Sequence, residues 1–490
     1  MTNYFQPKVD PPLADIRIIK LTLLAVVVLE LLSFVAYRFP LSHTYLFVLA
    51  VLFTIALFAK KLEYGFYFLL LELFIGSKGY LLALTLPSGD RISLRFAIFV
   101  IAIIFYLITL IKGKGKEFFT ENKWLGPYLA LAFFVAIGIT NGWLLSSSKS
   151  FWFFDLNSWL FFLAAPIFFT CLKSKDSLKN IVSILLASSL YLSLKTLFIL
   201  SFFGATTTPL AGFVYYWIRN TGVGEITFLK ENLYRVFFQS QLFLLPALLI
   251  SGAFMKQAPT KKQCLPWFGY LIIISSALLA SLSRSFWLGI IVIIILALFL
   301  PRHAGAVAVN GVINKFNVAQ AGKFVGKLCV VFVMSLILLS LLTLNFWPKV
   351  LYGRLENQTE EAAGASRINQ LQPLLKRIAE RPILGSGFGA DFTYKTSDPR
   401  ALAENPTGLR TTYASEWGFL DIALKIGILG LLAYLWINIK ILISTPTRGQ
   451  IWALKCLILA GLLTVNIFSP YLNHPLGICW ILLLSFTEES

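Results

Sequence analysis

The stretch Phe96-Ala-Ile-Phe-Val-Ile-Ala-Ile-Ile-Phe-Tyr-Leu-Ile-Thr-Leu-Ile111 contains no charged residue and is followed by Lys112, Lys114 and Lys116. Together with the residues just before it, this stretch can cross the apolar core of a bilayer as a helix. Comparable apolar stretches recur along the whole sequence. The predicted spans are 20–37, 43–59, 64–84, 93–111, 124–144, 156–172, 180–203, 236–254, 265–282, 286–300, 325–346, 418–443, 451–468 and 471–486. We therefore predict an all-α, polytopic integral membrane protein with about 12–14 transmembrane helices.

The composition supports this fold class. Of the 490 residues, 58% are hydrophobic and only 13% are Asp, Glu, Lys or Arg, and the mean hydropathy is +0.78. A soluble protein cannot bury that much apolar surface, whereas a bilayer can accommodate it. The net charge of +19 could indicate nucleic-acid binding. However, the basic residues lie in short clusters between apolar stretches, which is the pattern of membrane topology, so we predict no nucleic-acid partner.

The positions of the lysines and arginines orient the chain. With the N-terminus in the cytoplasm, every inner loop is basic and the short outer loops hold fewer basic residues. The inner set includes Lys60, Lys61, Lys112, Lys114, Lys116, Lys123, Lys173, Lys175, Lys179, Lys256, Lys261, Lys262, Arg302, Lys315, Lys323, Lys327 and Arg448. The alternation indicates an even number of spans, with both termini cytoplasmic. We also interpret the N-terminal apolar stretch as an uncleaved helix, because no small-residue cleavage site follows it.

Two predicted outer segments are too long to be turns. The expected organisation is N-terminal transmembrane helices over 1–203, an outer loop over 204–235, central transmembrane helices over 236–346, a large outer loop over 347–417, and C-terminal transmembrane helices over 418–490. The large loop has the composition of a small soluble subdomain.

Several site types are not predicted. The five cysteines lie in or beside apolar spans and form no disulfide framework or CxxC motif: Cys171, Cys264, Cys329, Cys456 and Cys479. The three histidines, His43, His303 and His474, lack metal-ligand spacing. There is no GxxxxGK[ST] motif for a nucleotide. We therefore expect no metal and no cofactor.

Arg284 lies in Ser281-Leu-Ser-Arg-Ser-Phe-Trp287, at the predicted outer boundary between two spans. An arginine there runs against the positive-inside bias. Its guanidinium can grip a pyrophosphate with bidentate geometry. Its side chain can equally reach lipid phosphates as an ordinary interfacial arginine.

Residues 366–381 form a second cationic feature of the outer loop. As a helix, they place Ile368, Leu371, Leu374, Leu375 and Ile378 on one apolar stripe. Arg367 falls on the edge of that stripe, with Gln370, Arg377 and Arg381 along the same side. Such a helix suits a substrate with a lipid tail and an anionic head, although it can also be a plain amphipathic surface helix. Pro373 is expected to kink the helix or to mark its start.

Other outer residues extend the candidate site. Arg235 heads a span and Arg219 precedes it, so both are further candidate phosphate ligands. The glycines of Gly385-Ser-Gly-Phe-Gly389 allow either a simple turn or a close approach to a ligand. The carboxylates in or near the large outer loop include Glu356, Glu360, Glu361, Asp391, Glu404 and Glu416. Glu416 is best placed to act as a general base towards a sugar hydroxyl, the alternative being a solvated surface acid.

These residues, in this order, resemble the O-antigen ligase and Wzy-type polymerase superfamily of bacterial membrane proteins. The resemblance covers about residues 200–440 and rests on the large outer loop and three motifs. The motifs are Ser283-Arg284 at the head of a span, Ser366-Arg367 with the following run to Gly389, and Glu416-Trp-Gly-Phe-Leu-Asp-Ile-Ala-Leu-Lys-Ile-Gly-Ile-Leu-Gly430.

The resemblance implies an enzyme of the bacterial inner membrane that transfers glycans from undecaprenyl-pyrophosphate at the periplasmic face, without a metal or a nucleotide sugar. It implies that Arg284 and Arg367 hold the pyrophosphate. Ligases of this family carry a histidine shortly before the Gly-x-x-Gly, where this sequence has Ser415-Glu416-Trp417. We therefore expect a polymerase of O-antigen, capsule or exopolysaccharide repeat units, with Glu416 as the base and an O-antigen ligase as the alternative.

The expected partners are the lipid-linked oligosaccharide, membrane lipid, a chain-length regulator and a flippase. A transporter or flippase of lipid-linked glycan or a small solute is a further alternative. It draws on the intramembrane charges Glu30, Glu72, Lys195, Asp421, Lys425 and Lys455. The one-sided outer loop and the lack of an evident internal repeat argue against it.

Overall fold

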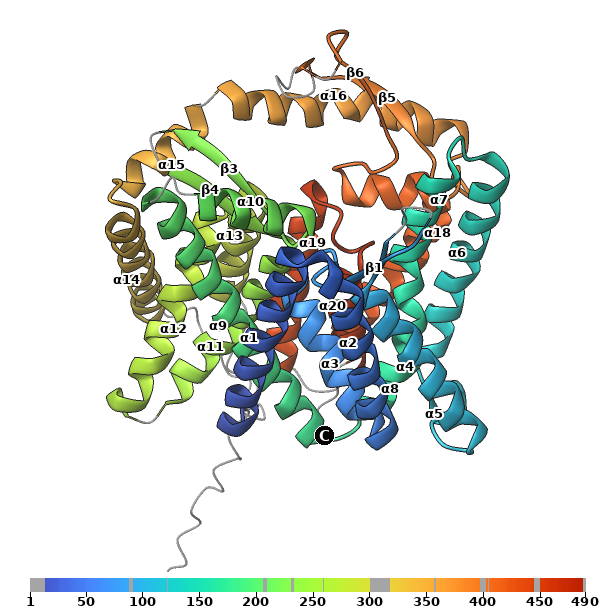
Figure 1. The fold of residues 1–490 in the computed structure, drawn as a ribbon, viewed down its shortest axis with the longest axis horizontal. Helices are drawn as coiled ribbons and strands as arrows, with labels where there is room; N and C mark the ends of the chain where they lie inside the picture. Colours follow the sequence, from blue (N-terminus) through green and yellow to red (C-terminus); the bar gives the residue numbers. More distant parts are fainter. Residues whose placement is uncertain are drawn as a thin grey trace, which may run out of the picture.

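The computed structural model describes residues 14–87, 91–120, 122–205, 209–230, 233–258, 260–299, 318–356, 358–396, 402–403, 405–444 and 450–487. Its helices form one bundle, and a long helix with short hairpins covers one end of it (Figure 1). The expected mostly helical membrane architecture is confirmed.

The first half of the chain contributes α1 (Ile16–Arg38), α2 (Pro40–Lys60), α3 (Leu62–Ile75), α4 (Leu94–Ile111), α5 (Glu117–Thr120), α6 (Leu125–Leu145), α7 (Lys149–Trp159), η1 (Leu160–Ala164), α8 (Ala165–Cys171), α9 (Lys175–Ala205) and α10 (Pro209–Asn220). The second half contributes η2 (Gln239–Phe243), α11 (Leu244–Gln257), α12 (Lys261–Ala280), α13 (Arg284–Phe299), α14 (Val318–Thr343), α15 (Trp347–Glu356), α16 (Gln358–Glu380), α18 (Gly418–Ile443), α19 (Gln450–Phe468) and α20 (Pro475–Phe486).

Within the described ranges, three antiparallel hairpins join these helices. They are β1 (Ala83–Thr85) with β2 (Arg91–Ser93), β3 (Gly224–Lys230) with β4 (Leu233–Phe238), and β5 (Phe392–Lys395) with β6 (Leu409–Thr412). The last two hairpins and α16 lie at the end of the bundle that is uppermost in Figure 1. We call this end the loop face. The charge distribution of the sequence predicts that it is the outer face.

Ten described helices are long and apolar enough to cross a membrane, counting Lys149–Cys171 as one. Two shorter apolar helices, α13 and α20, join them. Four of the fourteen predicted spans correspond to described helices that are short for a membrane crossing. Helices α3 and α11 have 14 residues each, α13 has 16 and α20 has 12. Even 16 residues extend only about 24 Å, against a hydrocarbon core of about 30 Å. The predicted span 236–254 also begins within β4 and η2, so part of its apolar run is a hairpin strand.

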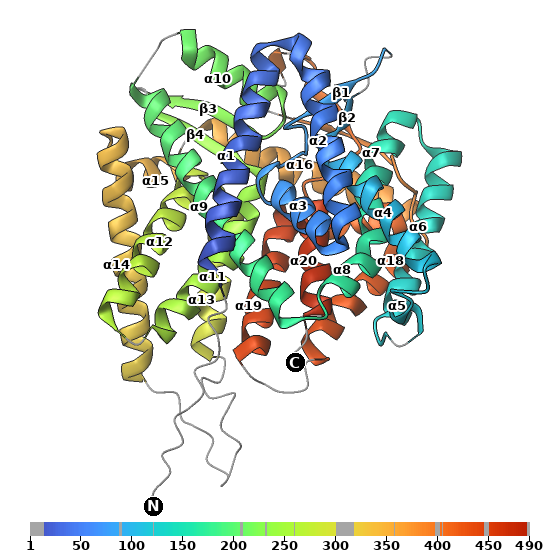
Figure 2. The same ribbon diagram turned by 60° about the horizontal axis from the view of Figure 1, so that its bottom comes forward.

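Helix α9 lies at the centre of the larger part of the bundle, where it packs against α1, α3, α12 and β4. Helix α14 lies at the edge, beside α12 (Figure 2). On the other side of the bundle, α6 packs along α18, and α18 contacts α19 and α20. This second group carries most of the candidate site.

Intramembrane charges in the first half of the chain are paired within the bundle. Lys195 donates to Glu30 at 2.7 Å, and Arg95 donates to Glu72 at 2.8 Å. All four side chains are buried. Buried charges that are matched in this way are typical of packed helix interiors, so these residues no longer need a transport role to explain them.

Candidate functional site

The structure brings Arg367 and Glu416 of the large loop segment into contact. Arg367 lies in α16, and Glu416 lies just before α18. The Nε atom of Arg367 donates to a carboxylate oxygen of Glu416, forming an ion pair. The two side chains are 35% and 42% exposed, so the pair remains open to solvent. The guanidinium has two further nitrogen atoms, which can donate hydrogen bonds to a second anion.

Backbone contacts hold this Arg367–Glu416 pair in place. The backbone N–H of Glu416 donates to the side-chain oxygen of Gln370 at 3.3 Å. The indole N–H of Trp417 donates to the carbonyl oxygen of Arg367 at 3.0 Å. Because the Gln370 side chain is buried, it holds the backbone of Glu416 in a fixed position. The juxtaposition of the two charges is therefore built into the fold and does not depend on the ion pair alone.

Helix α16 docks differently from the sequence prediction. It continues through Pro373 without a break in the assigned helix. Leu374 and Ile378 are buried, whereas Ile368 and Leu375 are 68% and 46% exposed. The predicted five-residue stripe is therefore only partly covered by protein. The face that packs on β5 and α18 follows Gln370, Leu374 and Ile378, spaced four residues apart. That Ile368 and Leu375 face the membrane surface stays a prediction.

After α16, the chain inserts into a break in α18. Gly427 has φ +74°, which interrupts the helix. The carbonyl oxygen of Leu424 accepts from Ser386 N at 2.7 Å, and that of Lys425 accepts from Gly387 N at 3.1 Å. Beyond the break, Ile428 N donates to Pro382 O at 2.8 Å. The inserted segment thus satisfies backbone groups that an interrupted helix in a membrane would otherwise leave unpaired.

The glycines of residues 385–389 are required by this insertion. A Cβ atom on Gly385 would lie 2.5 Å from Gly427 N, and one on Gly387 would lie 2.1 Å from Gly142 N of α6. Both glycines also have positive φ. Between them and Gly389, Phe388 is fully buried and its N–H donates to Gly138 O at 2.9 Å. The segment does turn, with Ala390 N donating to Gly387 O at 3.2 Å. The motif is more than a turn, however, because its glycines also allow close contact with α6, α7 and α18. Whether they approach a ligand stays a prediction.

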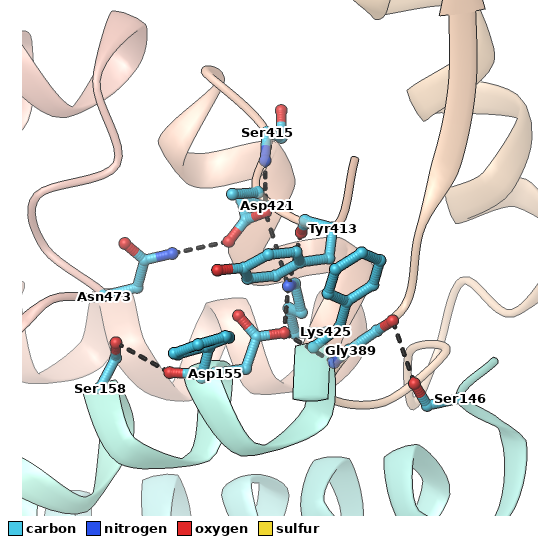
Figure 3. Close-up of polar contacts among 12 residues, drawn as sticks. Ser146, Asp155, Ser158, Gly389, Tyr413, Ser415, Asp421, Lys425 and Asn473 are labelled. Carbon is cyan, nitrogen blue, oxygen red and sulfur yellow. Dashed lines mark hydrogen bonds and ion pairs between the residues drawn. The ribbon is translucent and has the colours of Figure 1, made fainter. Parts of the chain in front are cut away.

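A buried charge network lies beneath this junction (Figure 3). It consists of Asp155 in α7, Asp421 and Lys425 in α18, and the amide of Asn473. The Lys425 ammonium pairs with Asp155, lies 4.0 Å from Asp421 and donates to the Tyr413 carbonyl at 2.7 Å. Asp421 accepts from Asn473 Nδ2 at 2.6 Å.

Each carboxylate in the network also accepts a hydrogen bond from a backbone N–H group. Asp155 accepts from Gly389 N at 2.6 Å, and Asp421 accepts from Ser415 N at 3.1 Å. The network therefore fixes both the glycine segment and the residue that precedes Glu416. Hydrogen bonds to carboxylates are among the stronger ones in proteins.

Tyr413 covers the network. Its ring stacks on Phe151 with 4.5 Å between centroids, and the Lys425 ammonium lies 5.3 Å from its centroid. Burial raises the pKa of Tyr413 to about 12, helped by the negative charges of Asp155 and Asp421. The phenol therefore remains neutral at physiological pH and seals the network from one side.

Arg284 and Arg235 form a second cationic position. Arg284 is exposed at the first residue of α13. Arg235 in β4 donates from Nε to Ser281 O at 2.8 Å, in the turn that leads into α13. The two arginines are therefore held to the same α12–α13 turn. A helix N-terminus carries a partial positive charge, so this position favours an anion.

Of the three remaining predicted phosphate ligands, Arg219 and Arg377 make contacts within their own helices. Arg219 donates to Tyr215 Oη at 2.8 Å within α10. Arg377 pairs with Glu380 one turn along α16. Arg381 is exposed directly after α16. Arg219 and Arg377 thus differ from Arg367, which meets a residue 49 positions away.

Among the other acids, Asp391 accepts from Ser147 Oγ at 2.7 Å. Glu404 and His303 lie outside the described residues, as do the side chains of Glu356, Glu360 and Glu361. Within the described ranges, no three His, Cys, Asp or Glu side chains gather in a metal-binding arrangement. His474 caps α20 by accepting from Leu476 N at 3.4 Å.

Sequence reasoning missed Asp155 and Asn473 and assigned Asp421 and Lys425 to a different hypothesis. The available signal was the pair of opposite charges four residues apart in an otherwise apolar stretch, since such a pair lies on one helix face. Asp155 is 270 positions from Lys425 and carries no local signal of that contact.

Comparison with known families agrees with the resemblance seen in the sequence. A family model described as O-antigen ligase matches residues 269–435. The matched region includes Arg284, Arg367, Glu416, Asp421 and Lys425. Proteins with this domain are enzymes that transfer lipid-linked glycans. No curated protein and no solved structure matches the chain significantly.

Proposed function

Taking residues 269–435 as a domain of the O-antigen ligase family, we propose that this multi-pass membrane protein polymerises lipid-linked oligosaccharide repeat units. The donor would be an undecaprenyl-pyrophosphate-linked glycan, and the product an O-antigen, capsule or exopolysaccharide. The reaction would take place at the loop face, which the charge distribution assigns to the periplasm. Neither a metal nor a nucleotide sugar would take part.

The observation that carries this proposal is the contact between Arg367 and Glu416. Glycan transfer needs a group that accepts a proton from the acceptor hydroxyl and a group that stabilises the departing pyrophosphate. The pair supplies a carboxylate and a guanidinium side by side, both partly exposed. A polymerase rather than a ligase is favoured because Glu416 stands where the family's ligases carry a histidine.

The proposed transfer would form one bond and break one bond at the anomeric carbon of the donor sugar. The acceptor hydroxyl oxygen attacks the anomeric carbon of the donor sugar, and the bond from that carbon to the pyrophosphate oxygen breaks. The hydroxyl proton passes to Glu416, and the bonding electron pair leaves with the pyrophosphate. Arg367 and Arg284 would stabilise the negative charge that grows on the leaving group, since guanidinium stays charged at any working pH.

Further arginines would guide the anionic head to this position. Arg235 shares the α12–α13 turn with Arg284, while Arg377 and Arg381 follow Arg367 along and beyond α16. Arg219 would contribute from α10. Arg219 and Arg377 contact residues of their own helices. We therefore expect smaller effects from removing these two side chains than from removing Arg284 or Arg367.

A gel of surface polysaccharide tests the function. A strain deleted for the gene would be complemented with wild type, Arg284→Ala, Arg367→Ala or Glu416→Gln. The expected result is a polymer ladder for wild type and single repeat units for the deletion and the three variants, at equal protein levels. Lys376→Ala, an exposed lysine of α16, is the matched control and should give the wild-type ladder.

Other outcomes separate the alternatives. Full-length polymer that accumulates on its lipid carrier would identify a ligase. Wild-type ladders from all three variants would contradict the assigned site. An unchanged glycan in the deletion strain would contradict glycan transfer and direct attention to transport.

A further inference from the structure

We propose that Asp421 is a positioning residue for Glu416, and that the network of Asp155, Lys425 and Asn473 holds Asp421 for this task. The proposal rests on the proposed function, because it assumes that Glu416 takes part in the transfer. It adds a residue that neither the sequence motifs nor the family match assigns to the site.

Asp421 is bonded directly to the segment that carries Glu416. Asp421 accepts from the backbone N–H of Ser415, at 3.1 Å, and from the amide of Asn473, at 2.6 Å. Its own N–H donates to Trp417 O at 2.8 Å. Both neighbours of Glu416 are therefore bonded to Asp421. Ser415 is bonded to its side chain (Figure 3), and Trp417 is bonded to its backbone N–H.

Asp421 and Lys425 are both buried. Asp421 is 3% exposed and Lys425 is 0% exposed, so neither can touch a substrate directly. Burying a carboxylate is costly unless it is paired and hydrogen-bonded. A plain Asn or Ser at this position could accept one hydrogen bond without that cost. The charged carboxylate of Asp421 forms a stronger hydrogen bond than a neutral acceptor would form. Its presence is explained if the segment before α18 must be held firmly.

Lys425 contacts both carboxylates of the network. Lys425 links Asp421 to Asp155, and Asp155 accepts from Gly389 N in the inserted segment. That segment follows directly after α16, which carries Arg367. One buried ammonium is thus connected to the backbone beside Glu416 and to the chain that fixes α16. Misplacing catalytic groups by small distances is enough to slow a reaction strongly.

A kinetic double-mutant cycle tests the proposal with purified full-length protein and a synthetic polyprenyl-pyrophosphate-linked repeat unit. Asp421→Ala should lower kcat about tenfold or more while the donor KM changes less than about twofold, because only the placement of the base is lost. In a Glu416→Gln background, the same change should lower the remaining rate less than about twofold, because the group that Asp421 positions is already absent.

A rescue variant distinguishes a loss of positioning from misfolding. Asp421→Asn keeps an acceptor for Ser415 N but turns an amide towards Asn473. Combining it with Asn473→Asp restores that hydrogen bond and keeps the charge count, so most of the kcat should return. Glu30→Gln serves as the control, since it also breaks a buried carboxylate–lysine pair and should lower thermal stability without changing kcat per folded molecule.

Equal losses from Asp421→Ala in both backgrounds would overturn the positioning role, as would a rise in donor KM that accounts for the whole loss. A wild-type rate for Glu416→Gln alone would instead contradict the proposed function. The two failures are therefore distinguishable.

Discussion

Trp417 donates a hydrogen bond from its indole nitrogen to the backbone carbonyl oxygen of Arg367, across 3.0 Å. The bond links the neighbour of Glu416 to the backbone of the residue with which Glu416 pairs. The Trp417 ring also packs on Phe468 of α19, with 5.5 Å between centroids. Trp417 therefore joins α16, the start of α18 and α19 at the candidate site.

We expect Trp417→Phe to weaken catalysis while leaving the protein folded. Phenylalanine keeps the aromatic contact but cannot donate to Arg367 O, so α16 can shift relative to Glu416. Stability should fall by about 1 kcal/mol, the usual worth of such a bond, and kcat by about threefold to tenfold. Thermal unfolding in detergent and a glycan-transfer assay measure the two effects.

The matched control is Trp452→Phe. Its indole N–H donates to Leu442 O at 2.9 Å, a bond of the same kind between the end of α18 and α19. It should cost similar stability without loss of kcat. Equal kinetic losses in both variants would show that Trp417 has no specific relation to the site.

Lys425→Met should destabilise the protein strongly. Removing the ammonium leaves two carboxylates, Asp155 and Asp421, buried without their cation, which costs about 3–5 kcal/mol for a broken buried pair. Adding Asp155→Asn should recover part of the loss, since asparagine can still accept from Gly389 N. Melting temperature and folded yield in detergent report both changes.

Lys376→Met, at an exposed position of α16, is the comparison and should change stability by less than about 0.5 kcal/mol. If Lys425→Met melts like wild type, the buried network does not hold the fold together.

The extent to which the sequence predicted the structure follows from what local patterns can encode. Long charge-free stretches such as Phe96–Ile111 identify helices because length and hydropathy suffice. The same pattern failed at the start of the predicted span 236–254, because residues 236–238 belong to the strand β4, which buries Val236 and Phe238. A short apolar run fits a buried strand as well as a helix, so hydropathy merged it with α11.

The candidate site shows a similar division. Arg367 and Glu416 were identified individually as outer charged residues, and the sequence gives no measure of their separation. Their contact depends on Gln370, Trp417 and the insertion of residues 382–387 into α18. The break at Gly427 explains why the sequence has a glycine there. Without the tertiary contact, however, that glycine could not be distinguished from one that only eases helix packing.

Gly427→Ala should prevent correct assembly of the site. The position has φ +74°, and an added Cβ would lie 2.0 Å from Ile383 O. Both the backbone conformation and the close contact oppose any side chain. We expect little folded protein, or a protein whose 382–387 segment becomes accessible to protease while wild type resists.

Gly252→Ala in α11 is the control, because nothing lies within 4 Å of its added Cβ. Alanine is the better helix former, by about 1 kcal/mol, so stability should hold or rise. Normal folding of Gly427→Ala would show that α18 can close its break and that the inserted segment is dispensable.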